Sequence, residues 1–218
     1  MSTLDGGSDP RTGGDGMGAV PATERPEGQQ RDVTWPVPPP GGFTAEDLDR
    51  LPDLPPHTEL IDGSLVFVSP QKNFHSLVLS LLETGVRACS PSYARVRREM
   101  SVRLGARQRP EPDVLVVRDD AVVSMEQTYY SPDAVLLAVE VVSPDSEERD
   151  RYRKPELYAA AGIPHFWRVE EDDGAPVVYV YERDPATRSY ALTGIHRHSL
   201  KLEAPFEVEV DLTGIDRM

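Results

Sequence analysis

The stretch of residues 135–142, Val-Leu-Leu-Ala-Val-Glu-Val-Val, constrains the fold most, because seven of its eight side chains are apolar and only Glu140 is charged. A continuous apolar run of this length is typical of a strand that is covered on both faces. Ser143 and Pro144 follow the run and are expected to end the strand. The chain is therefore expected to build a central sheet with other elements packed on both sides.

Two helices are expected to provide that cover. The first is predicted to be capped by Asn73 and to run to about Cys89, because apolar side chains recur at helical spacing on one face. Cys89 is interpreted as a core thiol that extends this face. The second is predicted to end at Ala161 and Gly162, with the glycine as its C-cap. Pro155 is expected to kink this helix or to begin a new one, because proline has no amide hydrogen to donate.

Shorter apolar segments predict the remaining strands. Asp62-Gly63 lies between two of them and predicts a tight hairpin turn. Thr44 is expected to cap a short helix at the start of the folded body. The fold class that results is a mixed α/β (α+β) domain with a central sheet. The predicted strands are residues 59–61, 65–68, 94–104, 113–117, 165–170, 177–182, 190–193 and, as a final edge strand, 206–210.

The first 42 residues have a different composition from the rest. They hold 9 of the 16 glycines and 7 of the 21 prolines, with almost no large apolar side chains. Such a segment cannot bury enough surface to offset the entropy of ordering. We therefore expect residues 1–42 to be a disordered Gly/Pro-rich tail and residues 43–218 to be one folded domain.

Nothing in the sequence predicts a membrane protein or a secreted one. The apolar runs, such as residues 135–139, are far shorter than the ~20 residues that a membrane helix needs. The chain does not open with a basic segment followed by an apolar one, as a signal peptide does. With Cys89 as the single cysteine, a disulfide framework and a cysteine-based zinc site are excluded within one chain. These features predict a cytoplasmic protein.

The charge is acidic overall and unevenly placed. A formal net charge of −14 argues against a protein that binds nucleic acid through its overall charge. Residues 111–150 alone carry a net charge of −9, which would repel DNA, whereas residues 95–109 carry +5. This basic stretch is interpreted either as a groove for a phosphate backbone or, equally, as a solvated strand face that balances the acidic body.

Two carboxylates occur where buried strands are predicted. Asp113 opens one apolar strand, and Glu140 lies inside the next. A charge within a buried strand is costly unless it is paired or bound to a metal. If the two strands are neighbours, both carboxylates can converge on one hard cation such as Mg²⁺, which prefers oxygen ligands. The alternative is that Asp113 caps a turn and Glu140 pairs with an arginine.

A lysine follows these acids on the second helix. Asp150, Lys154 and Tyr158 are spaced four residues apart and share one helix face, provided that the kink permits it. Lys154 would then point toward the strand that carries Glu140, where it could orient or deprotonate an attacking water and stabilise developing charge. The alternative is an exposed Asp150–Lys154 pair that stabilises the helix by a few tenths of a kcal/mol.

Taken together and in this order, the motifs resemble the Uma-two family of bacterial restriction-endonuclease-like proteins, which have the PD-(D/E)XK nuclease fold. The resemblance covers roughly residues 43–195. The motifs that carry it are Glu59-Leu60-Ile61-Asp62-Gly63, His75 on a helix, Pro112-Asp113-Val114, Val139-Glu140-Val141-Val142-Ser143-Pro144, the set Asp150, Lys154 and Tyr158, and Gly162-Ile163-Pro164-His165-Phe166-Trp167.

The resemblance implies a restriction-endonuclease-like core, in which helices flank a central mixed β-sheet, with extra β-strands at the C-terminus. It also implies a Mg²⁺-dependent endonuclease that hydrolyses phosphodiester bonds in DNA, with Mn²⁺ as a substitute metal. Asp113 and Glu140 match the two acids of the nuclease motif and would hold the metal, and Glu59 would add a third catalytic acid. The lysine of the motif normally stands two residues after the second acid. Here Val142 occupies that position, so Lys154 is the candidate.

Further residues are assigned to the substrate. Arg97, Arg98 and Arg103 of the basic stretch would bind it, together with His75 and Tyr158. His75 is alternatively a structural or capping histidine, and Tyr158 alternatively packs under the strand or orients the lysine. DNA is the expected partner, and a homodimer is expected because cutting both strands of a duplex usually needs two active sites. The alternative function is that of a catalytically inactive interaction or regulatory scaffold.

Overall fold

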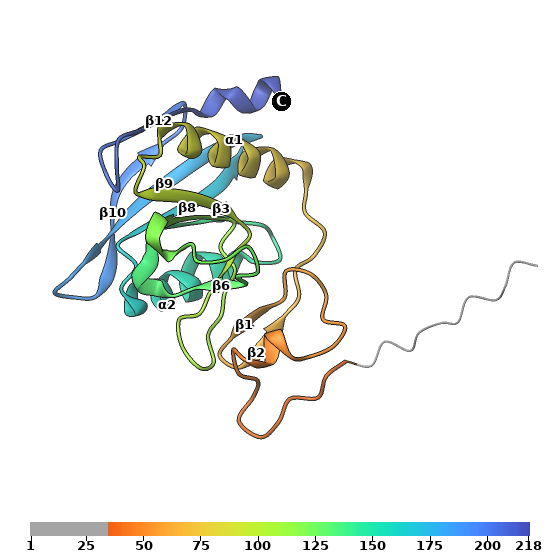
Figure 1. The fold of residues 1–218 in the computed structure, drawn as a ribbon. Helices are drawn as coiled ribbons and strands as arrows, with labels where there is room; N and C mark the ends of the chain where they lie inside the picture. The colour runs from red at the N-terminus through yellow and green to blue at the C-terminus, as the bar shows by residue number, and fades with distance from the viewer. Residues whose placement is uncertain (1–34) are drawn as a thin grey trace, which may run out of the picture. The chain divides into compact units, whose positions relative to one another are not determined.

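A six-stranded mixed sheet forms the centre of this computed structural model, which describes residues 35–218 (Figure 1). β7 and β8 run parallel, and the other neighbouring strands are antiparallel. Most of the predicted tail, residues 1–34, lies outside the described residues, and Pro36–Met218 form one compact unit. The strand order is β10 (Ser189–His196), β9 (Ala175–Asp184), β8 (His165–Asp172), β7 (Val135–Val141), β5 (Val114–Arg118) and β3 (Ala94–Arg98).

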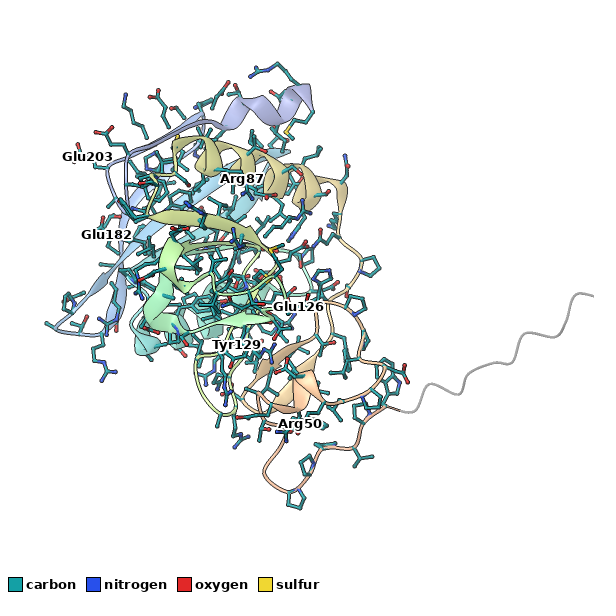
Figure 2. The ribbon with its side chains drawn as sticks, in the orientation of Figure 1. Arg50, Arg87, Glu126, Tyr129, Glu182 and Glu203 are labelled. Atoms are coloured by element: carbon teal, nitrogen blue, oxygen red, sulfur yellow. The ribbon has the colours of Figure 1, made fainter. Side chains whose placement is uncertain are left out.

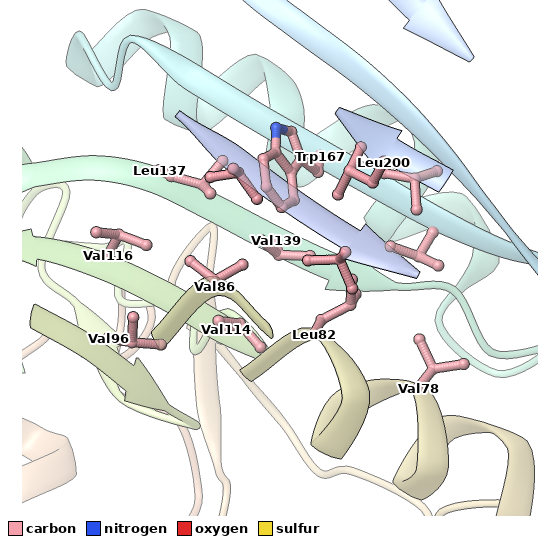
Figure 3. Close-up of a cluster of buried hydrophobic side chains, with 14 of the residues drawn as sticks. Val78, Leu82, Val86, Val96, Val114, Val116, Leu137, Val139, Trp167 and Leu200 are labelled. Carbon is pink, nitrogen blue, oxygen red and sulfur yellow. The ribbon is translucent and has the colours of Figure 1, made fainter. Parts of the chain in front are cut away.

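One face of this sheet is covered by the predicted helix, α1 (Asn73–Cys89), but the N-cap position is occupied by Lys72 and not by Asn73. Its apolar stripe packs on Val139 and Trp167 in the larger core cluster (Figure 3). The hairpin of β11 (Ser199–Leu202) and β12 (Val208–Asp211) lies against α1 on the same side (Figure 1). A Cβ at Gly85 would approach Val210 to 2.6 Å, so the glycine permits this close contact between α1 and β12.

The opposite face is covered by a π-helical turn, Arg149–Arg153, that continues into α2 (Lys154–Ala161). Because Pro155 has no amide hydrogen, an α-helical bond to the carbonyl of Arg151 cannot form, and the predicted irregularity at this proline is confirmed. α2 ends at Gly162, whose φ of +95° suits a C-cap glycine. Apolar side chains of α2 and the sheet form the second core cluster, which includes Leu115, Ala138, Tyr158, Ile163 and Phe166.

The segment before α1 forms a small layer with its own core of Phe43, Ala45 and Leu60. β1 (Glu59–Ile61) and β2 (Ser64–Val66) form the predicted hairpin, and Asp62 and Gly63 in its turn both have positive φ, as a type I′ turn requires. The backbone of Leu60 exchanges two hydrogen bonds with that of Arg109, of 3.1 and 2.8 Å. These bonds fix β1 beside the segment that leads into β5.

The structure departs from the sequence prediction in three further places. The predicted strand of residues 94–104 is broken at Glu99, whose φ is +50°, and its second part, β4 (Ser101–Val102), pairs with β6 (Tyr129–Tyr130) instead. The predicted strand of residues 206–210 is not an edge of the central sheet, because β12 pairs with the unpredicted β11. Thr44 does not accept a capping hydrogen bond but donates two to the carboxylate of Asp47. Short 3-10 helices occur at Asp47–Asp49, Asp119–Ala121, Pro132–Ala134 and Leu212–Arg217.

Within residues 35–218, the helices are too short or too polar to cross a membrane.

The small layer depends on a partly buried ion pair. The guanidinium of Arg109 is buried and donates to Asp49 at 2.7 Å, which lowers the pKa of Asp49 below its ordinary 3.8. Replacing Asp49 by asparagine is expected to lower the free energy of unfolding by about 0.5–1 kcal/mol at neutral pH, because Arg109 loses a charged acceptor whose 41% exposure lets solvent screen the pair. A group with a lowered pKa stabilises the fold above its unfolded pKa and loses this effect as the pH falls through its folded pKa. The difference should therefore shrink below about pH 3.8.

Urea unfolding at several pH values would measure this effect. The exposed Asp53 is a matched control, because asparagine also tolerates its positive φ of 57°. Equal stabilities of the Asp49→Asn and Asp53→Asn variants at neutral pH would contradict the assignment.

Candidate active site

A pocket of about 250 Å³ lies where α1 begins, β7 ends and the π-helical turn enters α2. We name it the acidic pocket. Its ionisable lining is six carboxylates against two lysines, one arginine and one histidine. These residues are Glu59, Glu111, Asp113, Glu140, Asp145 and Asp150, with Lys72, Lys154, Arg149 and His75.

Asp113 and Glu140 are brought together by the pairing of β5 with β7. Val114 lies opposite Val139 in the antiparallel register, so the next pair of positions is Asp113 and Glu140. Side chains opposite each other in such a pair lie on the same face of the sheet. One oxygen of Asp113, Oδ2, accepts a hydrogen bond of 2.6 Å from the amide of Val141, which ties Asp113 to the end of β7.

Lys154 is buried among three carboxylates. Its Nζ lies 2.9 Å from Glu59 Oε1, 2.9 Å from Glu140 Oε2 and 3.1 Å from Asp150 Oδ1, and the side chain is only 6% exposed. Burial alone would lower the pKa of the ammonium, but the charges of Asp150, Glu140 and Glu59 outweigh burial and raise that pKa well above its ordinary value. The sequence alternative of an exposed Asp150–Lys154 pair is therefore wrong.

Glu140 is buried, although it lines the acidic pocket. Its Oε1 accepts a hydrogen bond of 2.5 Å from the hydroxyl of Tyr158, and its Oε2 faces Lys154. Burial raises the pKa of Glu140 well above its ordinary value, in spite of Lys154, because Asp150 also repels its charge. Burial likewise raises the pKa of Asp150.

His75, at the first turn of α1, reaches the other oxygen of Asp113. Its Nε2 lies 3.0 Å from Asp113 Oδ1, and both side chains are less than 15% exposed. Burial alone would lower the pKa of His75, but the hydrogen bond and the charge of Asp113 raise it. His75 lines the acidic pocket and pairs with Asp113, and the prediction that it binds substrate stays a prediction.

Glu59 joins the pocket because β1 is held beside the segment before β5. Besides Lys154, its Oε1 accepts a 2.7 Å hydrogen bond from the amide of Glu111. Glu111 lines the pocket, pairs with His57 at 2.6 Å and has a pKa raised by burial. Sequence reasoning did not include Glu111. Its position two residues before Asp113 is the one signal in the sequence that could have pointed to it.

The three arginines that were predicted to bind substrate lie outside the acidic pocket, whereas Tyr158 is buried next to it. Arg98 pairs with Glu99 at 3.0 Å, Arg103 pairs with Glu46, and Arg97 donates to the hydroxyl of Tyr130 at 3.1 Å. None of these arginines lines the acidic pocket. Tyr158 is fully buried beneath Glu140, so its hydroxyl is placed to orient that carboxylate.

Two cations that sequence reasoning missed do line the acidic pocket. Lys72 precedes α1, and Arg149 begins the π-helical turn. Neither side chain makes an ion pair or hydrogen bond with another described residue, and Arg149 Nε is buried without a hydrogen-bond partner. Both cations therefore keep donors available for an anion at the pocket.

The donors of the acidic pocket suit a hard divalent cation. Mg²⁺ binds proteins through one or two carboxylates and keeps several waters. Asp113 and Glu140 supply two carboxylates, and each of their oxygens accepts one hydrogen bond, which leaves a second lone pair free. Among the described residues, no group of three or more His, Cys, Asp and Glu side chains is arranged to hold a metal. The ammonium of Lys154 is paired with Glu59, Glu140 and Asp150 in this pocket.

Comparison with known proteins gives a family and a fold. Residues 45–213 match the model of the Uma2 family, described as "Putative restriction endonuclease". A crystal structure described as that of a "putative nuclease belonging to DUF820" from Anabaena variabilis ATCC 29413 is similar, with a TM-score of 0.59 at 17% sequence identity. The match covers 75% of this chain and 89% of the other, and at this identity it establishes the fold. None of the curated proteins matches the sequence.

Proposed function

The chain belongs to the Uma2 family of restriction-endonuclease-like proteins, and on this premise we propose that it is a Mg²⁺-dependent endonuclease that hydrolyses phosphodiester bonds in DNA. The observation that carries the proposal is the convergence in one pocket of Glu59 from β1, Glu140 from β7, Lys154 from α2 and Asp113, which directly precedes β5. Acids and a lysine in one pocket supply both ligands for a metal and a fixed cation near the reacting phosphate.

Asp113 and Glu140 would hold the metal, with Glu59 beside them. When bound, Mg²⁺ polarises the phosphate and lowers the pKa of a water. Tyr158 and His75 keep the two carboxylates oriented, because each donates to or pairs with one oxygen of the acid it contacts. In the reaction, water adds to phosphorus and the bond to the 3′ oxygen breaks, so the products carry a 5′ phosphate and a 3′ hydroxyl.

Lys154 would act as a permanent cation and not as a base. Its Nζ lies 2.9–3.1 Å from three carboxylate oxygens, and the charges of these acids raise the pKa of Lys154, which favours the ammonium form. It offsets part of the charge of Glu59, Glu140 and Asp150 and can stabilise charge that develops on the scissile phosphate. Of the two roles considered for this lysine, orienting and neutralising charge is therefore the one we propose.

Lys72 and Arg149 would guide the DNA strand to the acidic pocket. An acidic surface repels DNA, and cations with free donors are needed at the site of contact. Both side chains line the pocket without an ion pair to a described residue. Arg98 and Arg103, by contrast, are already paired with acids. We further propose that two copies act together when both strands of a duplex are cut.

The test is to incubate the full chain with supercoiled plasmid, single-stranded DNA and RNA, in Mg²⁺, Mn²⁺ or EDTA. We expect nicking of DNA in either metal and none in EDTA, with product ends that a ligase can rejoin without prior treatment. Cleavage that continues in EDTA, or product ends with a 3′ phosphate, would contradict the proposed chemistry.

A second candidate is a catalytically inactive scaffold with the same fold. The observation that favours it is the enclosure of Lys154 by three carboxylates, because its ammonium is already paired with Glu59, Glu140 and Asp150. Folded protein that cleaves no nucleic acid in either metal would support this candidate over the nuclease.

A further inference from the structure

A second pocket, of about 350 Å³, lies on the far side of α2 from Lys154. Pro155, Glu156 and Ala159 of α2 form one wall, whereas Lys154 and Tyr158 of the same helix contact Glu140. We name it the aromatic pocket. It shares no lining residue with the acidic pocket. Its other lining residues are Arg151, Tyr152, Phe166, Arg168, Tyr181, Arg188, Ser189 and Tyr190.

Three aromatic rings from β8, β9 and β10 line the sheet side of this pocket. The rings of Phe166 and Tyr190 are stacked at 5.4 Å between centroids, and those of Phe166 and Tyr181 lie 5.7 Å apart. Tyr190 is held in place because its hydroxyl donates to the carbonyl of Ile163 at 2.9 Å. Phe166 is only 1% exposed and supports the other two rings. The rings of Tyr181 and Tyr190 are partly exposed and present a preformed apolar surface on which a planar ligand can stack.

Arginines lie around these rings, and two of them have donors to spare. Arg151 is committed to Glu147 and Glu170. Arg168 lies over the ring of Tyr179 at 4.7 Å, and its terminal nitrogens make no hydrogen bond with a described residue. Arg188 makes one bond, of 3.2 Å from Nη2 to the carbonyl of Ala160.

The acids near the aromatic pocket do not neutralise Arg168 and Arg188 completely. Glu156 is the single carboxylate in the lining and pairs with Arg153 at 3.2 Å. Glu170 lies outside the lining and is paired with both Arg151 and Arg168. Arg188 and the outer edge of Arg168 therefore face the pocket as free donors, and a guanidinium suits a phosphate in charge and geometry.

We propose that the aromatic pocket binds a single nucleotide unit, with the base against Tyr181 and Tyr190 and the phosphate against Arg188 and Arg168. The volume is at the lower end of ligand pockets, which suits one nucleotide and excludes a duplex. The nucleotide unit could belong to a DNA strand, and only this part of the proposal rests on the proposed nuclease function. A free mononucleotide is the other source.

The test is equilibrium binding to the full chain in EDTA, so that no cleavage occurs. The probes are dAMP, dGMP, dCMP and TMP, the corresponding nucleosides, and inorganic phosphate. We expect saturable binding of at least one nucleotide, about tenfold tighter than its nucleoside and than phosphate alone. The absence of saturable nucleotide binding, or equal affinity for nucleotide and nucleoside, would overturn the proposal.

Variants locate the site. Arg188→Gln should weaken nucleotide binding about tenfold and leave nucleoside binding unchanged, whereas Tyr190→Leu should weaken both. Tyr190→Phe keeps the ring and should bind as the wild type does, which separates stacking from the hydroxyl bond. Arg197→Gln is the matched control, because Arg197 pairs with Asp172 and lies outside the pocket lining. Wild-type affinity in both Arg188→Gln and Tyr190→Leu would overturn the proposal.

Competition distinguishes the two sources. If the unit belongs to a DNA strand, a single-stranded oligonucleotide should displace the mononucleotide, and Tyr190→Leu should raise the KM for DNA cleavage. If the source is a free nucleotide, the oligonucleotide should not compete. Failure of the nuclease proposal would leave binding in EDTA intact, and failure of this proposal would leave metal-dependent cleavage intact, so the two can be told apart.

Discussion

Replacing Lys154 by methionine is expected to lower the free energy of unfolding by about 3–5 kcal/mol, because removing one partner of a buried ion pair leaves uncompensated charge. The ion pairs that Glu59, Glu140 and Asp150 make within the described chain all end on Lys154. Methionine retains most of the side-chain volume, so the loss would come from charge and not from a cavity. Urea unfolding followed by circular dichroism measures the change.

Lys201 provides the matched control. It is exposed and pairs with Glu209 at 3.5 Å, and such pairs contribute little to stability. Lys201→Met should therefore change the free energy of unfolding by less than about 0.5 kcal/mol. If Lys154→Met fails to fold, the double variant Lys154→Met with Glu140→Gln should recover folded protein. The second substitution removes one of the buried carboxylates that lost their ion pair with Lys154. Equal stability of the two single lysine variants would contradict the described charge cluster.

Replacing Glu140 by glutamine is expected to reduce metal-dependent DNA cleavage at least about 100-fold, since even residues that merely support a metal ligand cost 10–100-fold when changed. Glutamine has the same shape and can still accept the hydrogen bond from Tyr158, but it offers the metal no negative charge. Initial rates of plasmid nicking measure the loss, and circular dichroism checks that the variant is folded.

Glu203 is the control for this substitution. It is exposed, and its side chain extends away from the ribbon (Figure 2). Glu203→Gln should therefore nick plasmid at the wild-type rate. A Glu140→Gln variant that is as active as Glu203→Gln would exclude Glu140 from the metal site.

Local patterns were sufficient to predict much of the fold. The apolar stripe predicts α1 and its end near Cys89, because helical periodicity continues through all 17 residues. Asp62-Gly63 predicts the hairpin because both positions need positive φ. The break at Glu99 could not be predicted, since it depends on β4 finding β6 as a partner about thirty residues away in the chain.

Some residues of the candidate site could likewise be predicted from the sequence, and others could not. Asp113 and Glu140 could be predicted as site residues, because burying a charge in an apolar strand costs free energy unless the charge is paired or bound to a metal. The surroundings of Lys154 could not be predicted, because Glu59 reaches it only through the backbone pairing of Leu60 with Arg109. Pairing of the basic stretch with Glu46 and Asp49 likewise depends on how the small layer folds back.

The most direct test of the account is the initial rate of plasmid nicking by the wild-type chain, measured across Mg²⁺ concentrations beside Glu140→Gln. The account predicts a rate that rises with Mg²⁺ to saturation, falls to zero in EDTA, returns when Mg²⁺ is restored and is at least about 100-fold lower in the variant. A folded wild-type protein that nicks no DNA at any Mg²⁺ concentration, or nicks at the same rate as Glu140→Gln, would contradict it.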